Sequence, residues 1–301
     1  MALEKVRPKK GDPAEIEQLF PNYDLQIHCC RYWWLQNWEF EELSFPYWRV
    51  YYNNHQGAVI IQNEKEYRLT PDKVIIIPPN TSYATRLHDH PIPRNGFSLT
   101  GGRFTEQGTG MNGAKESNIL HLFIHFNIGM PYDNCAEGIF ELEVTPQIKK
   151  NIEEVKRLLN YEHTKFSLHS SLTIQSLISH LLTKLPNKLW QLESRDHRVI
   201  DVLNFIDNNI SEELTNPFLA EKAKMATNSF TRLFTEEIGM SPQKYVKKKR
   251  IDKACILLHH SSQTIDQIAF DLGFNDRYHF SKSFKQLTSK SPAKYRKEYG
   301  V

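Results

Sequence analysis

The spacing of apolar residues divides the chain into a β-rich first half and a helical second half. Between residues 20 and 145, short aromatic and β-branched runs are separated by proline, glycine and asparagine, which is typical of short antiparallel strands. Four of these runs are predicted strands: 47–52, 57–61, 73–77 and 119–128. After Pro146 the apolar residues recur every three or four positions, which is the period of a helix. The pattern predicts a multidomain α+β protein in which a small antiparallel barrel or sandwich precedes helices.

Two amphipathic helices are predicted between the β-rich part and the remaining helices. Ile148, Ile152 and Val155 share one face of the first helix, and the second helix ends before Pro186 because proline cannot continue a helix. The pattern is compatible with two roles: either the pair covers the β domain, or one of its helices forms a dimer seam. The expected segments are a β domain at 1–146, a helical dimerisation segment at 147–185, a polar linker at 186–197 and an all-helical domain at 198–301.

The last hundred residues contain an internal repeat with an offset of 50 residues. Alignment of 230–245 with 280–295 gives six identities: Phe230/Phe280, Phe234/Phe284, Ser241/Ser291, Pro242/Pro292, Lys244/Lys294 and Tyr245/Tyr295. A shorter helix is predicted before each copy, so each unit is helix, tight turn, helix. In the second turn, Gly273 can adopt a positive φ and Asn275 can cap the helix that follows. Units of this kind place their second helix in the major groove of DNA.

The charge distribution supports a polyanionic partner for this helical end. The whole chain has a net charge of only +3, but residues 240–301 hold 13 Lys and Arg against 5 Asp and Glu, a surplus of 8. This surplus argues against the alternative of a plain helical bundle with a duplicated hairpin. The predicted DNA-binding residues are Asn228, Thr231 and Arg232 in the first unit, and Asn275, Arg277, Tyr278, Ser281 and Lys282 in the second.

Residues 268–296 resemble the signature of the AraC/XylS family of bacterial transcription regulators. The matching residues are Ile268, Ala269, Gly273, Phe274, Asp276, Phe280, Phe284, Lys285, Ser291, Pro292, Tyr295 and Arg296. The resemblance implies two helix-turn-helix motifs that read successive major grooves of promoter DNA. We expect a homodimer formed by the helices at 148–185, a small-molecule effector and RNA polymerase as a possible partner; activator is the working class, and the sequence leaves the sign of regulation open. The chain departs from the family pattern at Lys224 and Ser289, where glycine is usual, and at Ala226, where a serine cap is usual and Thr227 is an alternative cap.

The first half resembles the cupin-like sensor barrel of sugar-responsive family members through residues 69–81. This resemblance implies that a sugar or related metabolite binds inside the barrel, stacked on aromatic rings. The candidate ligand-binding residues are Trp33, Trp34, Trp48, Arg49 and Tyr83, with Trp38 as a further ring. A barrel that binds no ligand and serves only for dimerisation is the alternative.

The histidines and cysteines form no recognisable metal or catalytic motif. His88 and His90 make the one H-x-H, and His121 and His125 lie ~13 Å apart along a predicted strand, too far to share a metal directly. Four scattered cysteines suit a reducing cytoplasm better than a disulfide framework. We therefore expect no cofactor, no catalysis and, without a run of about 18 apolar residues, no membrane partner. The rival hypothesis is a metal-dependent cupin enzyme with a helical appendage.

Overall fold

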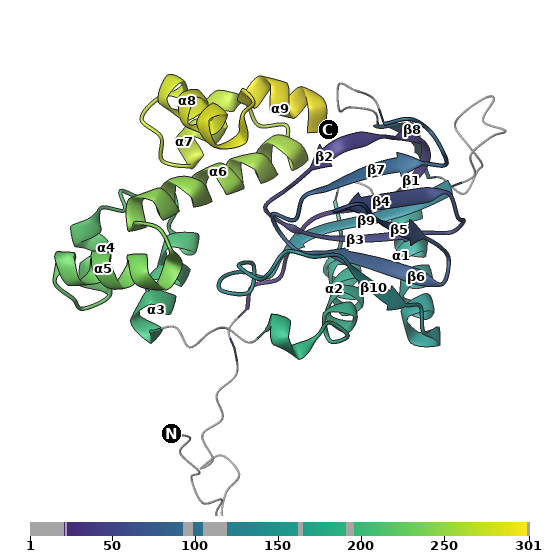
Figure 1. Ribbon diagram of the computed structural model, residues 1–301, viewed down its shortest axis with the longest axis horizontal. Coiled ribbons are helices and arrows are strands. Elements are labelled where there is room, and N and C mark those ends of the chain that lie inside the picture. Colours follow the sequence, from purple (N-terminus) through teal and green to yellow (C-terminus); the bar gives the residue numbers. More distant parts are fainter. Residues whose placement is uncertain are drawn as a thin grey trace, which may run out of the picture.

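A β-rich domain and a helical domain lie side by side in the structure (Figure 1). The computed structural model describes residues 21, 23–92, 99–104, 119–161, 165–190 and 196–299. Residues 101–113 are rich in glycine, for which the sequence predicts a flexible loop; its part from 105 onward, and the middle of the predicted linker, 191–195, lie outside these residues. Within the described part of the chain, no helix is both long enough and apolar enough to cross a bilayer.

The β domain consists of two antiparallel sheets. The larger sheet has the strand order β10-β6-β3-β9-β1-β8, and the smaller has the order β2-β7-β4-β5. The strands of the larger sheet are β1 (Gln26–Trp38), β3 (Trp48–Asn53), β6 (Lys73–Ile77), β8 (Leu99–Arg103), β9 (Ile119–Asn127) and β10 (Phe140–Glu143). Those of the smaller are β2 (Phe40–Leu43), β4 (Ala58–Gln62), β5 (Lys65–Leu69) and β7 (Tyr83–Leu87). The four predicted strands are therefore confirmed as β3, β4, β6 and β9.

The expected closed, cupin-like barrel is wrong. In the described residues each sheet is open, with edge strands β10 and β8 on one and β2 and β5 on the other. The two sheets face each other as a sandwich, and side chains such as Leu35, Ile60 and Ile75 between them are not exposed to solvent. Strand patterning predicts that residues are buried but not whether edge strands meet, which is why the sequence left barrel and sandwich unresolved.

The glycine pair at 101–102 belongs to strand β8 and not to a loop. A Cβ at Gly101 would lie 2.0 Å from the backbone oxygen of Trp34 on β1 and 2.7 Å from the indole nitrogen of Trp33. Only glycine therefore lets β8 approach β1 this closely. A flexible loop is therefore the wrong prediction for Gly101 and Gly102, because the sequence alone does not show how closely the two strands approach.

The two helices that follow the strands cover the outer face of the larger sheet. Helices α1 (Pro146–Tyr161) and α2 (Leu168–Leu182) bury Ile148, Ile152, Val155, Ile174 and Leu177 against that face. Of the two roles left open for these helices, covering the β domain is therefore confirmed. Leu168 and Leu172 of α2 remain 76% and 53% exposed, so one apolar edge of α2 is still uncovered.

The helical domain shows the predicted repeat directly. Its helices are α3 (His197–Asn208), α4 (Asn216–Lys222), α5 (Thr227–Ile238), α6 (Pro242–His260), α7 (Ile265–Asp271), α8 (Arg277–Thr288) and α9 (Pro292–Tyr299). Helices α5 and α8 begin 50 residues apart and have 12 residues each, and α6 and α9 begin at the paired prolines. Helix α6 has 19 residues, about 28 Å, and connects the two units.

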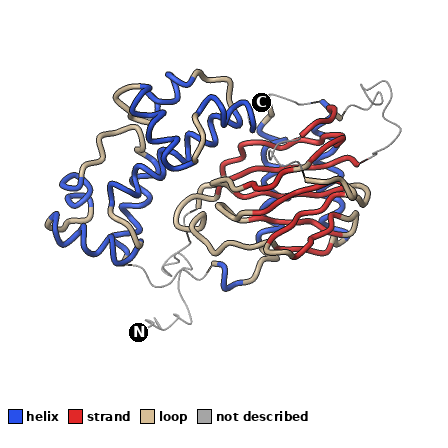
Figure 2. The backbone as a smooth tube through the Cα atoms, turned by 45° about the horizontal axis from the view of Figure 1, so that its top comes forward, coloured by secondary structure: helices blue, strands red, loops and turns tan. Residues whose placement is uncertain are grey.

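The two domains are in contact at the C-terminal ends of α6 and α9 (Figure 2). The Tyr47 hydroxyl lies 2.6 Å from Nδ1 of His259 at the end of α6, and the Phe45 ring packs edge-on against Tyr299 of α9. Buried residues of the sandwich interior and of the helical domain form one continuous hydrophobic cluster. A change inside the sandwich can therefore reach the helical domain through packed side chains.

Candidate nucleic-acid interface

The first helix-turn-helix unit is formed by α4 and α5. Its turn contains Lys224 with a φ of 52°, so lysine adopts the left-handed conformation for which the family usually has glycine. Ala226 is the N-cap of α5 and makes no side-chain capping bond, while Thr227 is already the first helical residue. The expectation that Thr227 caps the helix is therefore wrong. Phe230 and Phe234, both fully buried, fix α5 to the domain core instead.

The second unit is formed by α7 and α8. The sequence Thr264-Ile265-Asp266-Gln267 has the form of a capping box, and the structure has this box at the start of α7. Gly273 has a φ of 70°, and a Cβ there would lie 2.4 Å from the carbonyl oxygen of Ser211. Asp276, not Asn275, caps α8: its carboxylate accepts a hydrogen bond of 2.7 Å from the His279 amide. The expected cap was therefore one residue early.

Helix α8 ends in the conformation that the family pattern requires, although the usual glycine is missing. Ser289 has a φ of 60°, in the left-handed region, and ends the helix before Pro292 begins α9. A serine in this region costs free energy that a glycine would not. The two departures from the pattern, at Lys224 and Ser289, thus alter the residues and leave the turns intact.

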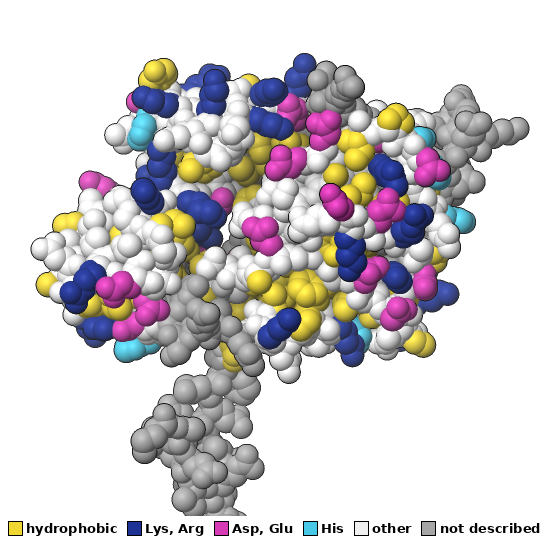
Figure 3. Space-filling view, viewed as in Figure 1, with side chains coloured by type: hydrophobic (Ala, Val, Ile, Leu, Met, Phe, Trp, Pro, Cys, Tyr) yellow, Lys and Arg dark blue, Asp and Glu magenta, His cyan; other side chains and the backbone are white. Residues whose placement is uncertain are grey.

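The predicted DNA-binding side chains lie on the outward faces of the two second helices. Asn228 and Arg232 of α5 are exposed, and so are Arg277, Tyr278 and Lys282 of α8. Thr231 and Ser281 are half-buried beside them, and Asn275 is exposed in the turn before α8. Each face lies opposite a buried phenylalanine pair, so the cores of both units point these helices outward. Figure 3 shows Lys and Arg side chains over the part of the helical domain that contains α8 and α9.

Sequence reasoning missed one residue on each face. Thr235 and Lys285 are exposed one turn beyond Arg232 and Lys282, and they extend the two faces toward the C-terminal ends of α5 and α8. They are themselves paired by the 50-residue offset. The helical spacing of three or four residues, applied once more, would have identified both.

The most basic run of the sequence, 247–250, is engaged within the protein. Lys248 pairs with Asp252 at 3.0 Å, Lys249 pairs with Asp207 at 2.9 Å, and Lys247 donates to Gln286 at 3.0 Å. The positive charge of this run therefore stabilises the helical domain. The positive charge on the outward faces of α5 and α8 comes from other Lys and Arg residues.

Arg250 joins the two helix-turn-helix units. Its guanidinium donates to the carbonyls of Ile210 and Glu212, which precede α4, and to the carbonyl of Gly273 in the second turn, at 3.0, 2.7 and 3.0 Å. A side chain at position 273 would clash with the backbone of Ser211 at this same junction. Burial lowers the pKa of Arg250, but a guanidinium stays charged at neutral pH. This contact fixes the second unit against the first.

The five candidate ligand-binding residues do not line one pocket. Trp34 and Trp48 pack on the helix-covered side of the larger sheet, where the Trp48 indole donates to Asp133 at 2.9 Å and its ring stacks on Phe126. The other candidates, Trp33, Arg49 and Tyr83, belong to the sandwich side, as does Trp38. Neighbouring residues of a strand point to opposite faces, so Trp33 and Trp34, or Trp48 and Arg49, cannot share one site.

Arg49 is a cation enclosed in the sandwich. Its side chain is fully buried, its guanidinium carbon lies 4.4 Å from the Phe45 ring centre and 4.8 Å from that of Tyr83, and Nη1 donates to the Tyr83 hydroxyl. Its Nε and Nη2 are buried without hydrogen-bond partners, and among the described residues no carboxylate pairs with it. A buried cation with unused donors is costly, which makes this position the strongest remaining candidate for an effector contact.

The histidines considered in the sequence analysis have different neighbours in the structure. His90 Nδ1 lies 2.9 Å from Glu39. His121 is fully buried, its Nδ1 lies 2.5 Å from Asn53 Oδ1, and burial lowers its pKa to about 3. His125 Nδ1 lies 3.3 Å from His260 Nε2, at the end of α6. His121 and His125 thus have different neighbours, as their spacing along the strand predicted.

Comparison with known proteins agrees with this geometry. Residues 219–298 match the helix-turn-helix domain family. A curated HTH-type transcriptional regulator of Haemophilus influenzae is 42% identical over 83 residues, 28% of each chain. The transcriptional activator RhaS of Yersinia pestis is 30% identical over 138 residues, 44% of this chain and 47% of its own. The matched region spans less than half the length of either relative.

The crystal structure of ToxT from Vibrio cholerae O395 is similar over 93% of this chain and 99% of its own, with a TM-score of 0.51 and 13% identity. This similarity concerns the fold, and it extends over both domains. The paired units and their outward polar faces define a domain of the helix-turn-helix class. Within that class, residues 219–298 are similar to the DNA-binding part of transcriptional regulators, in agreement with the AraC/XylS signature in the sequence.

Proposed function

We propose that this protein is a transcriptional regulator whose helices α5 and α8 enter successive major grooves of promoter DNA. The observation that carries the proposal is the duplicated unit: two 12-residue helices, each with a buried phenylalanine pair on one side and a polar, partly basic face on the other. Arg250 and Gly273 hold the two units in one arrangement, as binding to two grooves at once requires.

Each side chain on the two faces has a proposed role. Arg232, Arg277 and Lys282 reach base edges or nearby phosphates, with Asn228, Thr231, Tyr278 and Ser281 beside them, and Asn275 contacts phosphate. Arg277 forms an ion pair of 3.0 Å with Asp266, in which both side chains are more than half exposed. Such a pair is weak in water, so a phosphate or guanine can replace the carboxylate.

The β domain supplies regulation and assembly in this proposal. An effector that occupies the sandwich contacts Arg49 and Tyr83, and its presence is transmitted through Phe45, Tyr47 and the ends of α6 and α9. The uncovered edge of α2, with Leu168 and Leu172, is the proposed dimer seam. Activation through RNA polymerase and action in the cytoplasm complete the proposal, and catalysis has no part in it, since the curated relatives above are regulators.

Selection of duplexes from a random-sequence library, followed by fluorescence anisotropy on the selected sequence, tests this function. We expect specific binding whose affinity falls steeply with salt, because Lys and Arg release counterions from phosphates. Arg232→Ala and Lys282→Ala should each weaken binding, whereas Lys222→Ala, an exposed cation on α4 outside both faces, should not. Failure to enrich any sequence, with a folded protein, would contradict the proposal.

A further inference from the structure

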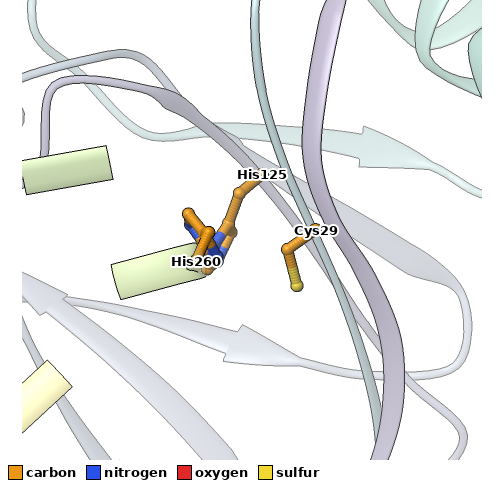
Figure 4. A group of neighbouring side chains, drawn as sticks. All are labelled: Cys29, His125 and His260. Carbon is orange, nitrogen blue, oxygen red and sulfur yellow. The ribbon is translucent and has the colours of Figure 1, made fainter. Parts of the chain in front are cut away.

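Three potential metal ligands from both domains meet at the domain boundary. Cys29 lies on β1, His125 on the neighbouring strand β9, and His260 on the last turn of α6 (Figure 4). One ligand atom from each residue lies within 4.8 Å of the other two. Strand pairing brings the first two together, since Cys29 is the register partner of His125, and the docking of α6 brings the third.

The spacing of the two imidazoles suits a single tetrahedral ion. The distance from His125 Nδ1 to His260 Nε2 is 3.3 Å. Two nitrogens each about 2.0–2.1 Å from one zinc ion, at the tetrahedral angle, are about 3.3–3.4 Å apart. The thiol within 4.8 Å completes a set of one sulfur and two nitrogens, which leaves one position for water or a further ligand.

The chemistry of these side chains also suits a thiophilic ion. Cys29 is a free thiol, and one sulfur with two imidazole nitrogens is a ligand set that zinc accepts. Burial raises the pKa of Cys29 to about 11, so the ion must displace the thiol proton, as coordinated zinc does.

The two histidines at the end of α6 differ in their contacts, and His260 approaches His125 through Nε2. His260 Nδ1 is buried and has no hydrogen-bond partner among the described residues. The adjacent His259 differs, since its Nδ1 lies 2.6 Å from the Tyr47 hydroxyl. His259 therefore has an ordinary packing role at the boundary, whereas His260, Cys29 and His125 have ligand atoms directed toward one another.

We propose that Cys29, His125 and His260 form a zinc site that clamps the helical domain to the β domain. Because the ligands come from both domains, an ion bound there stabilises the docked arrangement over any arrangement in which α6 has moved away. Zinc binding should therefore change the affinity of the helical domain for DNA, and this link between zinc and DNA rests on the proposed function. Metal binding itself does not.

Titration of the full-length protein with Zn²⁺, and with Co²⁺ as a coloured substitute, tests the site. We expect one ion per chain and a Co²⁺ spectrum with a thiolate charge-transfer band and tetrahedral d–d bands. Cys29→Ser should abolish the charge-transfer band, and His260→Gln should weaken binding more than about 100-fold. Cys135→Ser, a half-buried free cysteine outside the cluster, is the matched control and should bind like the wild type. His259→Asn perturbs the boundary but should retain the ion.

The outcomes separate the two proposals. Substoichiometric zinc in the wild type, or equal binding by Cys29→Ser and Cys135→Ser, would overturn the site. Zinc binding that leaves DNA affinity unchanged in the wild type would overturn the clamp. Zinc binding without any specific DNA binding would contradict the regulatory function and leave the metal site standing. Specific DNA binding by a protein that binds no zinc would overturn the metal site and leave the regulatory function standing. Circular dichroism of each variant verifies that the two domains remain folded.

Discussion

The helical domain and the β sandwich differ in how directly their sequences indicate function. In the helical domain, each outward helix face lies opposite a buried pair, Phe230 and Phe234 or Phe280 and Phe284, so position in a repeat predicts direction in space. In the sandwich, both faces of strand β3 are buried, and adjacent residues serve two separate cores. A local repeat thus specifies a surface, whereas an aromatic-rich strand does not specify a pocket. The predictions below test this contrast.

The largest expected effect concerns a residue that the sequence suggested for ligand binding. Trp48→Ala should lower the free energy of unfolding by about 3–5 kcal/mol, because the indole is fully buried and donates to Asp133. Urea unfolding, followed for the intact chain, measures the change. Trp34→Ala, at a half-buried position on the same side of the sheet, should cost less. Near-wild-type stability of Trp48→Ala would return this residue to the set of ligand candidates.

The second effect is a pH dependence that arises inside the sandwich. Burial lowers the pKa of His121 to about 3 in the folded protein, whereas the unfolded chain has the ordinary value of 6.5. Between these values the unfolded state binds more protons, so stability is present above pH 6.5 and falls as the pH falls toward 3. The loss at pH 5 relative to neutral pH is about 2 kcal/mol for this group.

Denaturant unfolding at pH 5 and pH 7.5 measures this dependence. His121→Leu should show a smaller loss at pH 5 than the wild type, whereas His197→Leu, whose side chain is 85% exposed, should show the same loss as the wild type. Asp133 is present in all three proteins, so the opposite contribution of its pKa, raised to about 6 chiefly by burial, cancels in the comparison. Parallel pH profiles for all three proteins would contradict a neutral, buried His121.

The third effect isolates the link between the two helix-turn-helix units. Arg250→Ala removes three hydrogen bonds to carbonyls and should weaken binding to a full operator by about 1–3 kcal/mol. Binding to a duplex that carries the segment for one unit should change far less, since each unit keeps its own core. Anisotropy on the two duplexes measures the difference. Equal losses on both would show that Arg250 acts within one unit and not between them.

The smallest effect concerns the ion pair that Arg277 makes with Asp266. Asp266→Asn frees the guanidinium and should tighten DNA binding by roughly 0.2–1 kcal/mol, the range for an exposed pair. Glu236→Gln is the matched control, because its longer contact with Arg232, 3.9 Å, should matter less. Anisotropy at low salt resolves a change of this size, and weaker binding by Asp266→Asn would remove Arg277 from the proposed contacts.

The features that could be predicted from sequence are those set by local spacing. The strands β3, β4, β6 and β9, the Thr264 capping box and the paired second helices all follow from periodicity or from residues a few positions apart. The turns keep their conformation without these glycines: Lys224 and Ser289 both have a positive φ, while buried phenylalanines fix α5 and α8 and Ser291-Pro292 begins α9 just after Ser289.

The features that could not be predicted depend on contacts between distant segments. The open sandwich depends on which edge strands meet, and the use of Gly101 depends on its approach to Trp33 and Trp34. Cys29 and His260 are 231 positions apart in the chain, and they come together only because the two domains dock. No spacing rule applies at such separations, which is why a search for metal motifs along the sequence did not find this group.

Hydroxyl-radical footprinting of the full-length protein on its selected operator tests the central claim most directly. Two helices anchored in one domain and facing DNA should protect two segments about one helical turn apart, ~34 Å. Arg232→Ala should weaken protection of one segment and Lys282→Ala that of the other. A single protected segment, or loss of the same segment in both variants, would contradict the account.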